Sequence, residues 1–266
     1  MLRRRPRRIP ALPRQFTYYS DLLSVLVSRE LKLLYKRSLL GIAWTLINPL
    51  LQLAVFSFVF QAILQVDVPH YGSYAFSGLL VWTWTQTSLI QATGLITNNQ
   101  PLIRQPSFPI AILPVVTITT GLIHFLLAFP VLLVFLLIDG VSVTPAIALL
   151  PVLLIIQFGL TMSLAYPLAS LNVTFRDTQH TVGVLLQLMS YLLPIFYATT
   201  QVPDRLQLLY RLNPFVSLLD AYRRVLLGGQ TPDWTALGGL LLAATLLLPV
   251  GYQIFRKQSD RFVEEV

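Results

Sequence analysis

Long stretches of the chain carry no charged side chain, and their lengths are the first structural signal. Six such stretches occur, and each exceeds the roughly 20 residues that a helix needs to cross a bilayer. Because backbone polar groups in lipid must bond within their own segment, we expect helices there. The expected spans cover residues 39–64, 73–97, 111–138, 145–170, 182–200 and 235–255.

Residues 15–37 precede the first span and follow a different pattern. Apolar residues recur at helical spacing, while Arg29, Lys32 and Lys36 occupy another side. A helix that is apolar on one side and basic on the other is typical of a segment in the lipid headgroup region. We expect an interfacial helix here, and the alternative is a solvated run of charge that only fixes topology.

The loop at 98–110 contains three prolines within nine residues, which excludes a long helix. Its Leu102, Ile103 and Phe108 are nevertheless apolar, and Arg104 lies among them. Exposed apolar side chains on such a loop indicate a docking site for another subunit. A turn that folds back onto the lipid interface explains them equally well.

The connection at 201–234 is long and contains two helical patterns. Asn213 and Pro214 separate them, and the second pattern places Phe215 and Tyr222 on one apolar face. Two amphipathic helices on one side of the membrane either dip back into it, cap an opening, or lie flat. Re-entrant backbone is tolerated only beside protein or a water-filled cavity, so the first arrangement indicates a conduit.

Composition agrees with a membrane protein. Of the 266 residues, 55% are hydrophobic and 11% are charged, and the mean hydropathy is +0.68. A soluble domain carries roughly 25% charged residues, so this balance excludes a soluble globule and a disordered chain. Cysteine is absent, which excludes disulfides, thiolate metal sites and cysteine nucleophiles.

The basic residues predict how the chain is oriented. More than half of the 19 Lys and Arg residues precede residue 38, which is typical of a topology signal rather than of a nucleic-acid partner. With six spans both termini share one side, and the positive-inside rule makes that side cytoplasmic. The loops carrying Arg104 and the pair Arg176 and Asp177 then also face the cytoplasm.

The domain organisation follows from this topology. We expect a basic tail at 1–14, the interfacial helix at 15–37, one six-span transmembrane domain at 38–256 and a cytoplasmic tail at 257–266. No cleavable signal peptide is expected, because prolines rather than an apolar run follow the basic start. The predicted fold class is thus an all-α integral membrane protein with six transmembrane helices, the interfacial helix and two short re-entrant or gate helices between spans 5 and 6.

The absence of a phosphate-binding loop and of charged residues in the expected spans restricts the possible functions. The chain has no Gly-Lys dipeptide and therefore no G-x-x-x-x-G-K-[S/T] phosphate loop, so any ATP energy must come from a partner. Inside the expected spans His124 is the single ionisable group of the Asp, Glu, Lys, Arg and His types, which disfavours an ion-coupled carrier. We expect no catalytic residue, metal or cofactor in this chain, and a membrane-embedded lipid-linked glycosyl enzyme stays open as an alternative.

Aromatic residues gather near the ends of the expected spans. Rings at span ends are expected for interfacial anchoring alone. Sugar rings also stack on such faces, so some of these rings are candidates for lining a channel. The candidates are Trp44, Tyr191, Phe196 and Tyr197.

Several short motifs together resemble a known family. The run from Tyr35 to Gly41, followed by Trp44 and Asn48-Pro49-Leu50, resembles the start of the ABC type-2 permeases that export polysaccharides such as O-antigen, capsule and teichoic acid. Further landmarks follow in the family's order: Phe76 to Trp82, Leu102-Ile103-Arg104 to Phe108-Pro109, Asn172 to Asp177, and Asn213-Pro214. The resemblance covers nearly the whole chain.

The resemblance implies partners and a cargo. It implies a homodimer joined to two cytoplasmic ATP-binding subunits, which hold the ATP and Mg, and export of an undecaprenyl-linked polysaccharide such as O-antigen across a bacterial inner membrane. It also implies that 98–110 is the ATPase-coupling loop and that 203–227 holds the outer gate helices. No nucleic acid is expected, and an ABC type-2 exporter of a drug or lipid stays open because it would share the topology.

Overall fold

The computed structural model describes residues 14–142 and 144–265, and this part of the chain contains helices and no strand. Except for Arg14, the predicted basic tail at 1–14 lies outside the described residues. The helices follow in the order α1 (Arg14–Leu34), η1 (Gly41–Ala43), α2 (Trp44–Ser57), the π-helical η2 (Phe58–Ile63), α3 (Tyr71–Asn98), α4 (Gln100–Ile103), α5 (Ile112–Ile138), η3 (Pro145–Leu149), α6 (Leu150–Thr174), α7 (Thr178–Leu192), η4 (Thr199–Gln201), α8 (Asp204–Leu212), α9 (Pro214–Leu226) and α10 (Trp234–Glu265).

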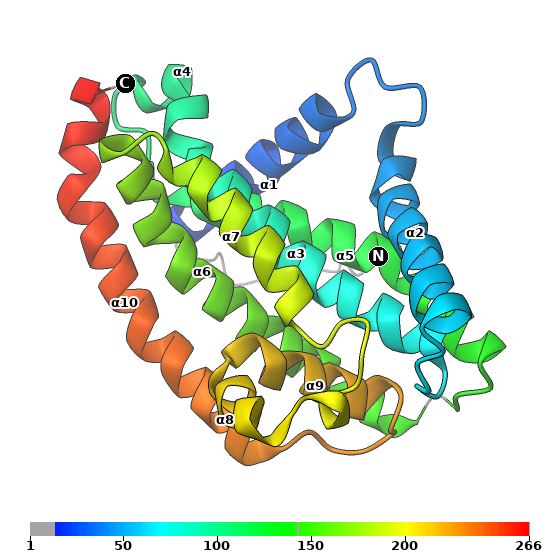
Figure 1. Ribbon diagram of the computed structural model, residues 1–266. Helices are drawn as coiled ribbons and strands as arrows, with labels where there is room; N and C mark the ends of the chain where they lie inside the picture. Colours follow the sequence, from blue (N-terminus) through cyan, green and yellow to red (C-terminus); the bar gives the residue numbers. More distant parts are fainter. Residues whose placement is uncertain (1–13, 143, 266) are drawn as a thin grey trace, which may run out of the picture.

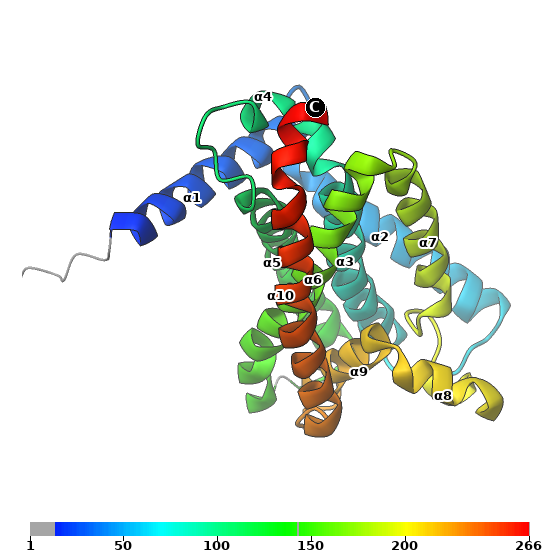
Figure 2. The ribbon, with the colours of Figure 1, turned by 90° about the vertical axis from the view of Figure 1, so that its left-hand side faces the viewer.

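The core lies between four long helices. α10 packs along α6, and α3 packs against both α5 and α6 (Figure 1). α3 is buried along most of its length, because it is covered by α2, α5, α6, α7 and α9. α1 projects away from this bundle and crosses the start of α5, where Leu26 and Val27 pack on Ile112 and Val116 (Figure 2).

The connections gather at two opposite ends of the bundle. α1, α4, the turn between α6 and α7 and the last turns of α10 lie at one end, and α8 and α9 lie at the other (Figure 1). We call the first the basic end, because it carries the exposed Arg29, Lys32, Arg176 and Lys257. The second is called the α9 end. The loops that the sequence places together therefore do meet at one end of the molecule.

Four helical segments of the described chain are long and apolar enough to cross a membrane. They are Gly41–Ile63, Ile112–Ile138, Pro145–Thr174 and Trp234–Ser259. The other two expected spans, 73–97 and 182–200, correspond to α3 and α7. α3 is long enough but rich in polar residues, and α7 has 15 residues. Both helices nevertheless run from one end of the bundle towards the other (Figure 1).

Two expected helix boundaries are wrong. The sequence predicted helix through residue 200, but α7 ends at Leu192 and Leu193 is extended (φ −75°, ψ 143°). Pro194 explains this, because a proline disfavours the helical conformation of the residue before it. At the other boundary α1 ends at Leu34 rather than at residue 37, so Lys36 lies in a turn that Arg37 completes with φ 64°.

Candidate functional site

The start of α9 is fixed by its own sequence. The Asn213 side chain accepts a hydrogen bond from the Phe215 backbone N–H at 3.0 Å, which satisfies one of the free donors at a helix start. Pro214 occupies the first helical position, where its missing N–H costs nothing. The predicted break at Asn213-Pro214 is therefore confirmed.

The apolar face of α9 is covered by protein. Phe215 meets the Trp82 ring edge-on at 5.3 Å between centroids, and Tyr222, 1% exposed, lies 6.2 Å from Phe125. α9 thus packs against α3, α6 and α10 rather than lying free on a surface. α8 differs, since it buries no residue and exposes Leu208, Leu209 and Leu212.

Arg223 fastens α9 to the rest of the bundle. Its Nη1 donates to the Pro194 carbonyl at 2.6 Å and to the Tyr74 hydroxyl at 2.8 Å, and its Nη2 donates to the Ile195 carbonyl at 3.0 Å. The guanidinium carbon also lies 3.5 Å from the centre of the Tyr74 ring, which is a cation–π contact. We call these contacts the Arg223 clamp; they join α9 to α3 and to the segment after α7.

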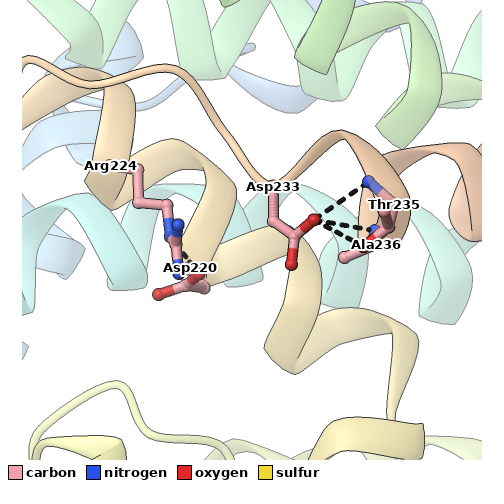
Figure 3. Close-up of polar contacts among 5 residues, drawn as sticks. All are labelled: Asp220, Arg224, Asp233, Thr235 and Ala236. Carbon is pink, nitrogen blue, oxygen red and sulfur yellow. Dashed lines mark hydrogen bonds and ion pairs between the residues drawn. The ribbon is translucent and has the colours of Figure 1, made fainter.

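The Arg223 clamp contains no carboxylate. The neighbouring Arg224 instead forms an ion pair, and its Nε lies 2.7 Å from Asp220 Oδ2 on the exposed side of α9 (Figure 3). Burial lowers the pKa of Arg223 to about 10, while Tyr74 and Asp220 act in the opposite direction. Arg223 therefore remains a cation at neutral pH, with its charge shared among carbonyl oxygens and one ring.

The start of α10 is fixed next to this site. Asp233 Oδ1 accepts hydrogen bonds from the Thr235 hydroxyl at 2.6 Å, the Thr235 N–H at 2.9 Å and the Ala236 N–H at 3.4 Å (Figure 3). These bonds lower the pKa of the exposed Asp233 carboxyl. The long final helix thus begins at a defined position beside α9.

The segment 193–198 connects four helices. The Phe196 ring, 4% exposed, stacks on Phe56 of α2 at 3.7 Å between centroids. Tyr197 shares a 2.7 Å hydrogen bond with the hydroxyl of Tyr210 in α8, and the Tyr74 hydroxyl donates to the Tyr197 carbonyl at 2.9 Å. Of the four candidate channel aromatics, Phe196 and Tyr197 are therefore packed, whereas Trp44 and Tyr191 are 42% and 54% exposed.

Polar side chains form an exposed row on α3 and α7. Gln86 Nε2 donates to Gln187 Oε1 at 3.2 Å, and Gln187 Nε2 donates to the Tyr191 hydroxyl at 3.2 Å. We call these three residues the amide row. α2 and α7 both pack on α3, and the amide row joins α3 to α7.

α2 is attached near both of its ends. At the basic end the Tyr35 hydroxyl hydrogen-bonds Thr45 Oγ1 at 2.6 Å and His124 Nε2 at 3.0 Å. Near the α9 end Phe56 and Phe60 pack on Phe196. His124 therefore serves as a packed hydrogen-bonding residue. Within the described chain no group of three or more His, Asp or Glu side chains is arranged to hold a metal ion.

The loop at 98–110 is less exposed than its apolar residues suggested. Ile103 is 2% exposed, and Leu102 and Phe108 are half-buried against the α1–α5 contact. The expectation of an exposed apolar knob is wrong, because these side chains pack internally. Within the loop Asn98, Gln100, Pro101 and the run from Arg104 to Ser107 are exposed, and Ser107 has a left-handed φ of 64°.

The remaining predicted residues lie at the basic end. Arg29, Lys32 and Lys36 are exposed, as are Arg176 and Asp177 in the turn between α6 and α7. Asn172 Oδ1 supports that turn by accepting a hydrogen bond from the Gln179 N–H at 3.0 Å. Burial raises the pKa of the neighbouring Glu30 on α1, and Arg29 opposes this shift.

Sequence reasoning missed Arg223. In the sequence Asp220 stands three residues before Arg223 and four before Arg224, so both arginines read as partners of one carboxylate on a solvated face. The signal that separates them is position: Arg223 directly follows the buried Tyr222 and lies four residues after the buried Leu219. Its acceptors are backbone carbonyls of another segment, which no side-chain pattern can indicate.

Comparison with known proteins gives one consistent result. The family model described as ABC-2 type transporter matches residues 21–227. A protein named O-antigen export system permease protein RfbA from Myxococcus xanthus is 35% identical over 257 residues, covering 96% of this chain and 99% of the relative. Two proteins of the same name from Klebsiella pneumoniae are 31% and 30% identical over 250 residues, covering 93% of this chain and 95% of each relative. The chain therefore belongs to the ABC-2 type transporter family.

Proposed function

We propose that this chain is the membrane-embedded permease subunit of an ABC exporter that moves an undecaprenyl-linked, O-antigen-like polysaccharide across a bacterial inner membrane. The observation that carries the proposal is the similarity, at 35% identity over 96% of the chain, to a protein named as an O-antigen export permease. ATP hydrolysis takes place on separate subunits, which hold ATP and Mg. This chain supplies the path and the surface on which those subunits act.

The proposed topology has six spans with both termini in the cytoplasm. α3 and α7 complete the set of six, since they run between the same two ends as the four apolar segments. The polar side chains of α3 are compatible with this placement, because a buried set of them is enclosed by protein rather than by lipid. These are Ser73, Ser77, Thr85, Ser88 and Thr93. The basic end then faces the cytoplasm by the positive-inside rule.

A second copy of the chain completes the path. The amide row is exposed within one chain, and exposed amides at membrane depth need protein or water as neighbours. We infer that α2 and α7 meet their counterparts in a homodimer and that the amide row faces the space between the copies. Trp44 and Tyr191 are the exposed rings that lie on these two helices.

The two ends of this path have different roles. At the basic end the exposed loop residues 104–107 and the turn at Arg176 and Asp177 form the surface offered to the ATP-binding subunits. At the α9 end α8 and α9, with Asn213, Pro214, Phe215 and Tyr222, act as the outer gate. The Arg223 clamp keeps this gate attached to α3.

Co-purification tests the proposal directly. The tagged chain is extracted gently from native membrane, and bound proteins and glycans are identified by mass spectrometry. We expect a subunit with a phosphate-binding loop in equal amount, together with a polyprenyl-linked glycan. A drug or lipid exporter would be favoured instead if the ATPase were recovered with no glycan and small hydrophobic compounds stimulated its ATP hydrolysis. A chain that turns over a nucleotide sugar alone would overturn the proposal.

The coupling surface is tested by one charge reversal. Arg104→Glu at the exposed loop is expected to reduce co-purification of the ATPase and export of the glycan at least about tenfold, because like charges across an interface cost several kcal/mol. Lys257→Glu is the matched control, since it reverses an exposed charge at the same end but outside the loop. Equal losses of ATPase binding and glycan export in both variants would contradict the assignment of the loop as the coupling surface.

A further inference from the structure

The largest cavity described in the structure lies between α1, the segment that leads into α5, and α10. Its volume is about 930 Å³, at the upper end of the roughly 300–1,000 Å³ of pockets that bind small ligands. The walls are mainly apolar and come from three separate parts of the chain. They include Leu23 of α1, Phe108 and Ile110 of the loop, Val115 of α5, and Phe255 of α10.

The position of the cavity along the bundle matches the boundary between lipid headgroups and acyl chains. One wall is the first turn of α5, where the apolar segment Ile112–Ile138 begins. The opposite wall is the part of α10 where the charge-free stretch 234–255 ends. A cavity that spans the start of one apolar helix and the end of another lies at the level where headgroups and acyl chains meet in the proposed topology.

The polar groups of the cavity come from α1 and α10. Tyr19 and Ser20 of α1 and Arg256 and Ser259 of α10 line it alongside the apolar walls. Arg256 is exposed, and among the described residues its side chain forms no ion pair. Arg29 and Lys32 of α1 add positive charge to the same end, so the local potential attracts anions.

We propose that this cavity binds one anionic phospholipid, with an acyl chain against Leu23, Phe108 and Phe255 and the phosphate at Arg256. Apolar walls with a guanidinium beside them match such a molecule in shape and charge, because Arg presents several N–H donors to phosphate oxygens. A zwitterionic lipid offers the same chain with less net charge. The inference depends on α1, the segment that leads into α5, and α10, and it holds whichever cargo the permease moves.

The bound lipid would contact the coupling loop through Phe108. Phe108 lines this cavity and also packs against the α1–α5 contact, so its position depends on what fills the cavity. The exposed residues 104–107 directly precede it. The lipid in the cavity thereby affects the position of the surface that meets the ATP-binding subunits.

Native mass spectrometry of the full-length chain tests the proposal. The detergent-solubilised protein is titrated with phosphatidylglycerol and, separately, with phosphatidylcholine of the same acyl chains. We expect one tightly bound phosphatidylglycerol and about tenfold weaker binding of phosphatidylcholine. Arg256→Gln should weaken the phosphatidylglycerol complex by about tenfold, the loss expected for one charge-assisted contact. Ser20→Trp should do the same by filling the cavity from the exposed side of α1.

Matched variants separate this site from general charge and from misfolding. Lys257→Gln removes an exposed charge beside Arg256, and Ser24→Trp adds the same bulk to α1 outside the cavity, so both should bind phosphatidylglycerol like the native chain. Equal binding of the two lipids, or equal losses in test and control variants, would overturn the proposal. So would displacement of the phosphatidylglycerol by a polyprenyl phosphate or by the bound ATPase subunit, because the cavity would then belong to cargo or partner.

Discussion

Arg223 illustrates how one residue secures a helix to the bundle without a carboxylate partner. Its guanidinium donates to the carbonyls of Pro194 and Ile195 and lies over the Tyr74 ring. These acceptors are available because Pro194 ends α7 and leaves an extended segment whose carbonyls have no helical partner. Arginine suits this position because its planar fork reaches several acceptors at once.

Replacing Arg223 should destabilise the protein far more than replacing its neighbour. Arg223→Met is expected to lower the free energy of unfolding by about 2–3 kcal/mol, since hydrogen bonds to a charged group contribute about 1.5–3 kcal/mol and leave buried carbonyls unpaired when lost. Arg223→Lys should recover little of this, because an ammonium cannot reproduce the fork. Chemical unfolding in mixed micelles measures both values.

Arg224→Met is the control for this comparison. Its exposed ion pair with Asp220 contributes about 0–1 kcal/mol. A loss at position 224 as large as that at position 223 would contradict the importance of the Arg223 clamp.

At the scale of elements, the sequence predicted those features that follow from local pattern. The break before α9 follows from Asn213 and Pro214, and the short α4 follows from three prolines in the loop. The end of α7 was misplaced because hydropathy continues through residues 193–200, while the helix itself stops at Pro194. The packing of Leu102 and Phe108 was missed because it depends on α1, which contacts the loop only in three dimensions.

The attachment of α1 should depend on pH through Glu30. Burial raises the pKa of Glu30, so its ionised form disfavours the packed state; stability is highest below the usual glutamate pKa and declines as the pH rises towards the raised value. Glu30→Gln should therefore raise the melting temperature at pH 7 by about 1–3 °C and change it less at pH 4.

Tryptophan fluorescence during heating measures this difference, with Asp21→Asn as the control because Asp21 is an exposed carboxylate on the same helix. An identical gain at both pH values would show that the neutral side chain packs better for a reason unrelated to charge.

At the scale of the whole molecule, topology is the property that the fold makes testable. The chain has no cysteine, so each introduced cysteine is the single site for a membrane-impermeant maleimide. We expect labelling from outside the cell at Asp67→Cys and Thr200→Cys, and from the cytoplasmic side at Gln105→Cys and Arg176→Cys. Positions 67 and 105 flank α3, and positions 176 and 200 flank α7.

The paired positions give a clear contradiction if the topology is different. Labelling of positions 67 and 105 from the same side would mean that α3 does not cross the membrane, and the same result at 176 and 200 would apply to α7. Labelling at Lys257→Cys fixes the side of the last helix, whose charge-free stretch ends at residue 255.

The two neighbouring arginines of α9 differ in their tolerance of acid. The Arg224 pair is exposed and depends on the charge of the Asp220 carboxylate. The Arg223 clamp rests on peptide carbonyls and a neutral ring, none of which is protonated in mildly acidic solution. α9 therefore stays fastened to the bundle in mildly acidic solution, and only alkaline solution near the lowered Arg223 pKa of about 10 removes the charge of Arg223.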